Sequence, residues 1–502
     1  MKRPVVWLLI ACFFSSIAQA ADGFRPVGVA TIDVTPDFPI RLTGYVVRKG
    51  LAESALTRLY AKALAIGSDA DGPAIIVTVD NCGVGANVVE EVANRLRQKV
   101  GITRDHFAVC SSHTHTGPQT IGFAANIFAM TIPAEQQSAI ERYTRQLTDK
   151  IEQAALAALK DRQPGKLEWA QGKVTFAKNR RTEGGPVDHT FSALRVLGRD
   201  GKLRALFANY ACHCTTLGGE INQTCGDWVG YADEYIQRDH PGATALIAVG
   251  CGADSNPHPR GGADFGIALC KQHGEEIARE TNRLLDREKW RPLNGKLACR
   301  WQQIELPFQK AFTKEELQKR STEAGIVGYH AQRYLERLNR GETPPTTLTY
   351  PVQSWTFGDR LAMVFLGGEV VVDYSLRLRR DFDSSRLWIN AYANDVPCYI
   401  PSKRILAEGG YEAESSLWYY DRPAQLSPDI EDLIVKTVRE QLPREFLSEQ
   451  RKADFPPALS PRQAVGALKL KPGFVAELVA AEPLIESPVA IDFGIDGKLW
   501  VV

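Results

Sequence analysis

The sequence predicts an α/β fold, a mixed β-sheet flanked by helices, for one large domain over residues 21–445. Short apolar runs alternate with long amphipathic stretches from about residue 25 to residue 440, which is typical of α/β domains. Polar residues follow directly after the apolar runs. The chain of 502 residues is also longer than one hydrophobic core usually serves, so we expect a second, smaller piece.

The predicted strands are short and apolar, and the predicted helices carry one apolar stripe. Val88, Val92 and Leu96 recur at a spacing of four residues, and comparable stripes run through 134–160, 266–287 and 313–339. The clearest strands are Ala74–Val79, Phe107–Ser111, Leu203–Ala211, Ala243–Val249, Leu361–Leu366 and Leu387–Tyr392.

Polar side chains gather just past the ends of these strands. They are Asp80, His113 to His115, His213, Asp254 to Asn256, Glu369 and Asp395. Ligands bind at the carboxyl edge of open α/β sheets, because loops converge there on a rigid support. Loops are polar in any case, and this alternative carries weight for Asp80 and Asp395. It explains the histidines less well, because the chain has only 9 and three of them lie at these positions.

The N-terminus predicts export. Lys2 and Arg3 precede an apolar run from Val5 to Phe14, and Ala18 to Ala20 fits a cleavage site. We therefore predict a signal peptide over residues 1–20 and a periplasmic or secreted protein. A lipid anchor at Cys12 is the less favoured alternative. No later run reaches the roughly 20 apolar residues that a membrane-spanning helix needs.

Charge and cysteines restrict the function classes. Lys plus Arg total 60 against 59 Asp plus Glu, so the chain lacks the basic excess that binds phosphate backbones, which argues against nucleic acid. One of the 10 cysteines lies in the predicted signal peptide. The remaining odd number cannot all pair internally. Cys212-His213-Cys214 lacks a Cys-x-x-Cys partner, so we expect buried thiols or disulfides there.

The C-terminal residues differ from the rest. Residues 446–464 are charged and contain prolines, which predicts a linker. Residues 465–502 contain short strand-like runs around an Asp496-Gly497 turn. They resemble the opening of a β-propeller of the sugar-dehydrogenase type, and we expect a truncated β segment without a core of its own.

His113-Thr114-His115 is the first candidate for chemistry. On an extended segment, side chains at this spacing point to the same side, so two imidazoles can face one metal ion. Hydrogen-bonded loop histidines are the alternative.

The segment from Ser112 to Pro118 resembles the His-Thr-His-Ser-Gly-Pro motif of the neutral/alkaline non-lysosomal ceramidases. The resemblance covers about residues 25 to 440. The other matching segments, in the family's order, are Gly28–Pro36, Thr43–Tyr45, Asn179–Arg180, Ala211–His213, Gly226–Ala232, Gly367–Glu369, Tyr399–Ile400 and Tyr411–Glu412.

The resemblance implies a single Zn2+ at the carboxyl ends of the strands, bound by His113, His213, Glu369 and Tyr399. Imidazoles and a carboxylate are good zinc ligands. For three of these residues the sequence leaves an alternative. His213 fits a core histidine, Glu369 fits the cap of a helix that starts near Val370, and Tyr399 fits simple packing.

The resemblance also implies the catalytic residues. Zinc-activated water attacks an amide carbonyl, His115 carries a proton to the leaving amine, and Arg180 and Tyr411 position the substrate. Arg180 paired with Glu183 at the surface is the alternative. Ser255 matches a serine that is important for activity in the family, but the neighbouring residues differ from the family's pattern. The alternative is that Ser255 only makes a hydrogen bond near the site.

We therefore predict an exported zinc-dependent amidohydrolase that cleaves an N-acyl amide bond of ceramide or a related lipid amide. A zinc hydrolase of another amide, an ester or a lactone is one alternative, and a non-catalytic exported binding protein is the other. Residues 123–130 are apolar and fit either a substrate groove or core. A lipid substrate is compatible with peripheral membrane contact.

Overall fold

The computed structural model describes residues 23–262, 265–287, 289–454, 459–471, 473–481, 490–494 and 496–501. The predicted signal peptide, residues 1–20, lies outside the described residues. The chain divides into two compact units, the first ending at Ser448 and the second beginning at Glu449. This division lies close to the end of the predicted large domain at residue 445.

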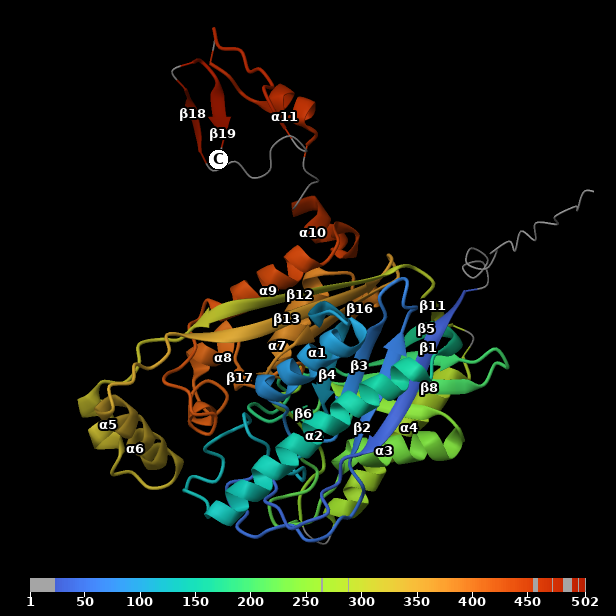
Figure 1. Ribbon diagram of the computed structural model, residues 1–502, viewed down its shortest axis with the longest axis vertical. Helices are drawn as coiled ribbons and strands as arrows, with labels where there is room; N and C mark the ends of the chain where they lie inside the picture. Colours follow the sequence, from blue (N-terminus) through green and yellow to red (C-terminus); the bar gives the residue numbers. More distant parts are fainter. Residues whose placement is uncertain are drawn as a thin grey trace, which may run out of the picture. The chain divides into compact units, whose positions relative to one another are not determined.

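A nine-stranded sheet forms the centre of the first unit, in the order β4-β3-β2-β1-β5-β7-β8-β9, with β11 paired to β5 (Figure 1). β3 pairs with β4 and β8 with β9 in parallel, and the other pairs are antiparallel, so the sheet is mixed. The strands are β1 (Phe24–Asp33), β2 (Tyr60–Ile66), β3 (Ala74–Val79), β4 (Phe107–Ser111), β5 (Gln163–Lys173), β7 (Thr190–Leu197), β8 (Leu203–Tyr210), β9 (Thr244–Val249) and β11 (Arg291–Pro292).

A second, four-stranded sheet packs on the first. It has the order β12 (Leu297–Pro307), β13 (Thr347–Phe357), β14 (Leu361–Leu366) and β16 (Leu387–Asn390). Large aromatic side chains fill the layer between the sheets, including Trp169, Phe207, Trp355 and Trp388. The rings of Phe207 and Trp388 stack with their centroids 4.9 Å apart.

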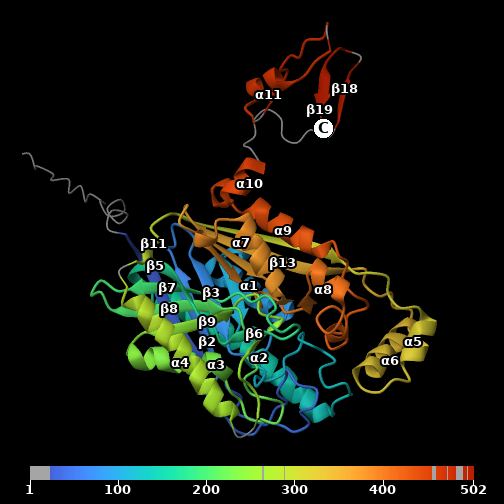
Figure 2. The same cartoon turned by 180° about the vertical axis from the view of Figure 1, so that it is seen from behind.

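Helices cover the outer faces of both sheets (Figures 1 and 2). Along β3, Ile75, Val77 and Val79 face the helices, whereas Ala74 and Ile76 face the second sheet, as the period of two requires. α1 (Ala86–Val100), α2 (Ala134–Lys160), α3 (Asp227–Asp239) and α4 (Gly266–Leu285) cover the first sheet, and α9 (Ile430–Gln441) packs on β12 and β13 beside α7 (Val372–Asp381). The unit thus has four layers.

The predicted elements are largely confirmed. β3, β4 and β14 have the predicted bounds, and β8, β9 and β16 end within two residues of them. The predicted helix over 313–339 is two helices, α5 (Lys314–Arg320) and α6 (Ile326–Asn339), because Gly325 turns the chain with a φ of 71°. The prediction of one sheet is wrong, because these strands belong to two sheets that pack face to face.

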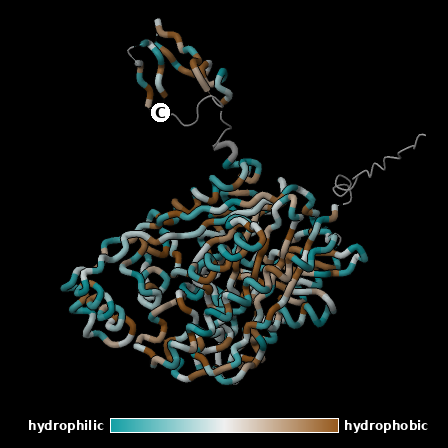
Figure 3. Tube along the Cα trace, in the orientation of Figure 1, coloured by the Kyte–Doolittle hydropathy of each residue, from teal (hydrophilic) through white to brown (hydrophobic). Residues whose placement is uncertain are grey.

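Hydropathy follows this layering. In Figure 3, apolar segments run along the strands at the centre of the first unit, and hydrophilic segments mark the pair α5 and α6. No helix in the described ranges combines the length and apolar character needed to cross a membrane. All nine cysteines after residue 20 are described, none is in a disulfide, and eight of them are buried. The expectation of buried thiols at Cys212 and Cys214 is therefore confirmed.

The second unit contains α10 (Glu449–Asp454), α11 (Pro461–Ala467) and a hairpin of β18 (Ile491–Phe493) and β19 (Leu499–Val501). The predicted linker over 446–464 therefore includes helical residues. The predicted turn at Asp496-Gly497 lies between the two hairpin strands. None of the residues that the structure describes between 459 and 501 is buried, as expected for a segment without its own core.

The aromatic layer between the sheets predicts a stability effect. Trp388 is fully buried against Phe207, and its Nε1 donates to Asn390 Oδ1 at 2.8 Å. Trp388→Ala should lower the free energy of unfolding by about 3–5 kcal/mol, because it leaves a cavity that the sheets cannot close. Urea unfolding measures this loss. The control Phe265→Ala removes a side chain that is 71% exposed and should change stability by less than about 0.5 kcal/mol. Equal effects of the two substitutions would contradict this packing.

Candidate metal centre and active site

The ends of several strands bring the predicted ligands together. His113 follows β4, His213 follows β8, and Glu369 begins β15 (Glu369–Val370) just after β14. β15 pairs in parallel with β17 (Tyr399–Ile400), with Glu369 opposite Tyr399. An isolated bridge joins Thr114 to Cys214 and holds the two histidine segments side by side. Short backbone pairings therefore position all four residues.

Two imidazoles and one carboxylate meet at the centre of this cluster. The Nε2 atoms of His113 and His213 each lie 3.1 Å from Oε2 of Glu369. All three side chains are buried. The convergence that the motif implied for His113, His213 and Glu369 is thus present in the structure. One ion could contact an atom from each of them.

Backbone carbonyls determine which ring nitrogen carries the proton. Nδ1 of His113 lies 2.6 Å from the carbonyl oxygen of Cys82, and Nδ1 of His213 lies 2.8 Å from that of Gly252. A carbonyl oxygen only accepts, so each Nδ1 must donate. In a neutral ring the Nε2 lone pair then faces Glu369, whose Oε2 has no hydrogen-bond partner among the described residues. Such carbonyl-anchored imidazoles are typical of zinc ligands.

The charges of the cluster also suit a cation. Burial acts to raise the pKa of Glu369, but His113 and His213 hold it well below its usual range, so the group is a carboxylate. Burial lowers the pKa of His213 to about 4, so that ring is neutral. Burial also acts to lower the pKa of His113, but Cys82 and Glu369 raise it to about 10, so a metal would have to displace the proton from its Nε2. Deprotonated carboxylate and neutral imidazole are the forms that bind metals.

Tyr420 was not predicted from the sequence. Its hydroxyl donates a short hydrogen bond to Oε1 of Glu369 and leaves Oε2 free to face the histidines. Tyr420 follows the short 3-10 helix Ser415–Trp418 and carries no motif that marks it in the sequence. Only the tertiary contact reveals it as a positioning residue.

The backbone at His113 differs from the expectation of an extended segment. His113 has a φ of 59°, in the left-handed region that a non-glycine residue rarely adopts, at a cost of about 1–3 kcal/mol. Tyr392, with a φ of 52°, packs its ring 4.3 Å from the ring of His113. The strained turn at His113, and not the alternation of side chains along a strand, therefore brings His113 and His115 close together.

His115 lies beside the three ligand candidates. Its Nε2 is 3.1 Å from Nε2 of His113, and the two rings are nearly perpendicular, at 87°. Burial, and then the neighbouring His113 and His213, lower the pKa of His115 well below its usual value, so it is neutral. Gly44 leaves room for this ring, because a Cβ there would lie 2.5 Å from it. Neutral His115 can accept a proton.

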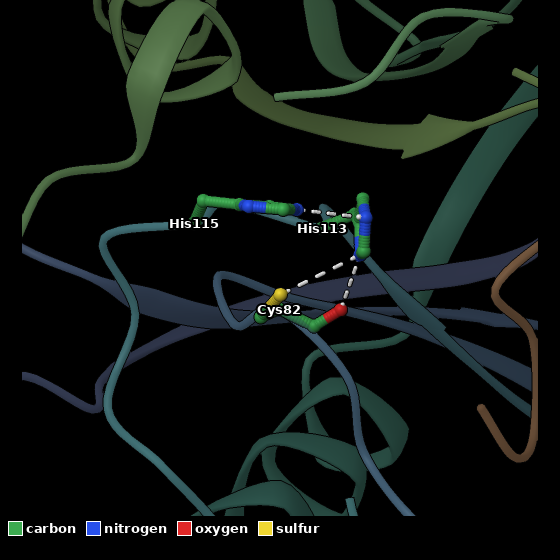
Figure 4. Close-up of side chains that lie close together, drawn as sticks. All are labelled: Cys82, His113 and His115. Atoms are coloured by element: carbon green, nitrogen blue, oxygen red, sulfur yellow. Dashed lines mark hydrogen bonds between the residues drawn. The ribbon is translucent and has the colours of Figure 1, made fainter. Parts of the chain in front are cut away.

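Cys82, His113 and His115 form a second group that could hold an ion (Figure 4). His113 Nδ1 is 2.6 Å from the Cys82 carbonyl oxygen but 3.7 Å from its sulfur. Burial raises the pKa of the Cys82 thiol, which keeps it protonated. The group of His113, His213 and Glu369 is therefore better suited to a metal.

Tyr399 and Arg180 extend the cluster toward solvent. The Tyr399 hydroxyl lies 3.3 Å from Nε2 of His213 and accepts a hydrogen bond of 3.2 Å from Arg180 Nη2. Arg180 also donates from Nε to Glu412 Oε1 at 2.8 Å. The proposed partner Glu183 makes no ion pair with it, so that alternative is wrong. The Arg180 guanidinium lies 5.3 Å from the centre of the Tyr411 ring.

A cavity of about 900 Å³ adjoins the cluster. His115, Arg180, Tyr399 and Tyr411 line it, so four of the eight predicted site residues face the same space. Of the apolar residues 123–130, only Ile127 lines the cavity. Phe123 and Phe128 belong to the core. Within this stretch, therefore, only Ile127 fits the prediction of a substrate groove.

Local hydrogen bonds bear on two further expectations. Ser255 begins β10 (Ser255–Pro257), where its carbonyl oxygen accepts from the backbone N–H of His213. Its Oγ is buried, has no partner among the described residues, and belongs to a residue that does not line the cavity. It braces His213 through the backbone. Glu369 does not cap α7, because the helix begins at Val372, whose N–H donates to Asp254 Oδ1.

Known proteins resemble parts of this chain in sequence. Residues 26–250 match the sequence model of the family described as neutral/alkaline non-lysosomal ceramidase, N-terminal, and residues 460–502 match a domain of unknown function. A neutral ceramidase of Drosophila pseudoobscura pseudoobscura is 23% identical over 48% of this chain and 36% of its own length. A neutral ceramidase of Drosophila melanogaster is 24% identical over 50% of this chain and 38% of its own length. The chain thus spans little more than a third of these relatives.

The fold comparison covers more of the chain. The crystal structure of neutral ceramidase from Pseudomonas aeruginosa superimposes with a TM-score of 0.65 at 18% identity, over 85% of this chain and 76% of the other. A structure titled ceramidase complexed with C2 gives the same TM-score over 84% of this chain and 76% of the other. The resemblance predicted from the motifs is confirmed: residues 26–250 match the N-terminal model of the neutral/alkaline non-lysosomal ceramidase family.

Proposed function

We propose that this chain is an exported zinc-dependent hydrolase that cleaves an N-acyl amide bond, of ceramide or a related lipid amide. One observation carries the proposal. Two imidazoles, each anchored at Nδ1 by a backbone carbonyl, direct Nε2 at a buried carboxylate oxygen, beside a cavity large enough for a substrate. No residue in the described part of the chain donates a hydrogen bond to this oxygen. The predicted signal peptide over residues 1–20 supports export.

His113, His213 and Glu369 would hold the ion, and the Tyr399 hydroxyl lies close enough to His213 to join them. Bound Zn2+ supplies Lewis acidity, which polarises a carbonyl and lowers the pKa of water toward about 7. Soft thiolates are absent from this group, and nitrogen and oxygen donors suit zinc.

The chain's own residues supply proton transfer and substrate binding. His115 is neutral and reaches both the cavity and His113, so it can accept a proton and deliver it to a leaving amine. Arg180 donates toward the cavity wall, where Glu412 and Tyr399 hold its guanidinium in place. A fixed cation there stabilises negative charge that develops on the carbonyl oxygen. Tyr411 adds an aromatic wall.

The cavity lining supports an amphipathic substrate. Val46 and Val47 line it and are 38% and 67% exposed, which suits an acyl chain. Five charged side chains also line it: Arg180, Arg181, Arg260, Glu408 and Glu412. These charged side chains favour a second candidate function, a related hydrolase whose amide substrate is more polar than ceramide.

The metal assignment predicts the effect of one isosteric change. Loss of an outer-shell partner of a metal ligand costs up to about 100-fold in metal affinity. Glu369→Gln should weaken zinc binding by more than this, because it removes the charge of a ligand itself. Metal analysis of purified protein and chelator competition measure the loss. Glu431→Gln is the control, since Glu431 is a largely buried carboxylate paired with Arg377 away from the cavity. A Glu369→Gln variant with full zinc content would contradict the assignment.

The reaction class is tested with a panel of substrates. Zinc-loaded protein is given ceramide, other N-acyl amides, an ester and a lactone, and then retested after chelation and after zinc is restored. We expect hydrolysis of at least one amide, its loss on chelation and its recovery with zinc. Hydrolysis that survives chelation would refute zinc dependence, and an inactive zinc-loaded protein would favour the binding-protein alternative.

A proton-transfer role for His115 predicts a selective defect. His115→Gln should keep zinc but lower kcat on an amide by about 10²–10⁴-fold, the usual contribution of a general acid–base group. The defect should shrink on an activated ester, because its leaving group needs no proton. His106→Gln, a partly buried histidine outside the cavity, is the control. Loss of zinc in His115→Gln, or equal defects on both substrates, would show that His115 has another role.

A further inference from the structure

The acidic residues of the cavity are already paired. Glu412 accepts from Arg180 Nε through Oε1 and from Arg181 through Oε2. Glu408 accepts from Arg404 at 2.7 Å through Oε1 and from Arg181 at 3.1 Å through Oε2. Both oxygens of each carboxylate are therefore occupied by guanidinium groups. Neither acid is free to receive a positively charged substrate group.

Arg260 differs from the other charged residues that line the cavity, because it has no oppositely charged partner among the described residues. No carboxylate in the described ranges forms an ion pair with it, and its hydrogen bond to the described residues runs from Nη1 to Thr215 Oγ1 at 3.0 Å. The Arg260 side chain is exposed, and no other hydrogen bond joins its guanidinium group to the described residues. Because the other lining arginines are matched by Glu408 and Glu412, Arg260 adds a positive charge that no lining acid neutralises.

Arg260 is also tied to the ligand segments. Thr215 follows the ligand candidate His213 by two residues, and its hydroxyl lies 3.4 Å from Oδ1 of Asn256. Asn256 adjoins Ser255, whose carbonyl oxygen accepts from the backbone of His213. The N–H of Gly261 donates to the carbonyl oxygen of Thr216 at 2.8 Å, which holds the Arg260 segment against the same strand end. Thr215, Asn256 and Arg260 all line the cavity.

We propose that Arg260 is a specificity residue that binds an anionic group, a carboxylate or a phosphate, on the amine side of an N-acyl amide substrate. The guanidinium fork matches both anions, and its anchorage through Thr215 reduces the entropy lost on binding. Val46, Val47 and Ile127 leave apolar wall for the acyl chain in the same cavity. This inference rests on the proposed hydrolase function and names its substrate class.

The test compares substrates with and without an anionic group on the amine side. One arm pairs N-octanoyl-glycine with N-octanoyl-glycinamide, and the other pairs the phosphate ester of N-octanoyl-ethanolamine with N-octanoyl-ethanolamine. For each pair, kcat/KM is measured with zinc-loaded wild type, Arg260→Gln, Arg260→Lys and Arg279→Gln. Arg279 is an exposed arginine of α4 that makes no ion pair within the described part of the chain and does not line the cavity, so it controls for the change in net charge.

We expect wild type to prefer the anionic member of at least one pair. Arg260→Gln should lower the ratio of kcat/KM between the members by about ten- to a hundred-fold, the range for a lost charge-assisted hydrogen bond. Arg260→Lys should retain part of the ratio, and Arg279→Gln should retain all of it. The arm with the larger ratio identifies carboxylate or phosphate. A ratio near one in both arms, or a preference that Arg260→Gln leaves intact, would overturn the inference.

Calorimetric binding of the same pairs separates this inference from the proposed function. Preferential binding of an anionic member that depends on Arg260, without hydrolysis of either member, would support the anion site and refute the hydrolase. Hydrolysis of both members at equal rates would support the hydrolase and refute the anion site.

Discussion

The buried carboxylate of Glu369 is the group on which the site depends. A buried charge is costly unless it is paired and hydrogen-bonded. Here Tyr420 satisfies one oxygen, and the other faces the Nε2 atoms of His113 and His213 at 3.1 Å. Because Nδ1 of each imidazole donates to a backbone carbonyl, a neutral ring brings a lone pair and not a proton toward the carboxylate. A divalent cation would satisfy all three groups at once.

The rest of the fold holds this arrangement in place. The two stacked sheets are rigid and well packed, and the ligand candidates lie on short segments just beyond their strands. Local pairings join those segments: Thr114 with Cys214, and Glu369 with Tyr399. This support also explains how His113 can keep a left-handed backbone, since such strain persists only where the surroundings determine it.

The cavity wall has features that the family motifs do not predict. The centre combines residues that those motifs predict, whereas the cavity wall mixes exposed valines with paired acids and one arginine without an acidic partner among the described residues. In the proposed hydrolase, substrate choice would fall to this wall, because zinc chemistry accounts for the cleavage of many amides. The fold likeness to known ceramidase structures leaves that choice open, because it reports on the backbone.

The sequence alone determined the local elements and the chemical types at the site. Apolar runs and helical stripes marked β3, β4, β14, α1 and α2, because periodicity records burial directly. The motif residues pointed to His113, His213 and Glu369. Only the tertiary structure decided that the strands form two sheets, that Arg180 pairs with Glu412, that Tyr420 orients Glu369 and that Arg260 lines the cavity. Each of these contacts joins residues far apart in the chain, and no local pattern encodes such a meeting.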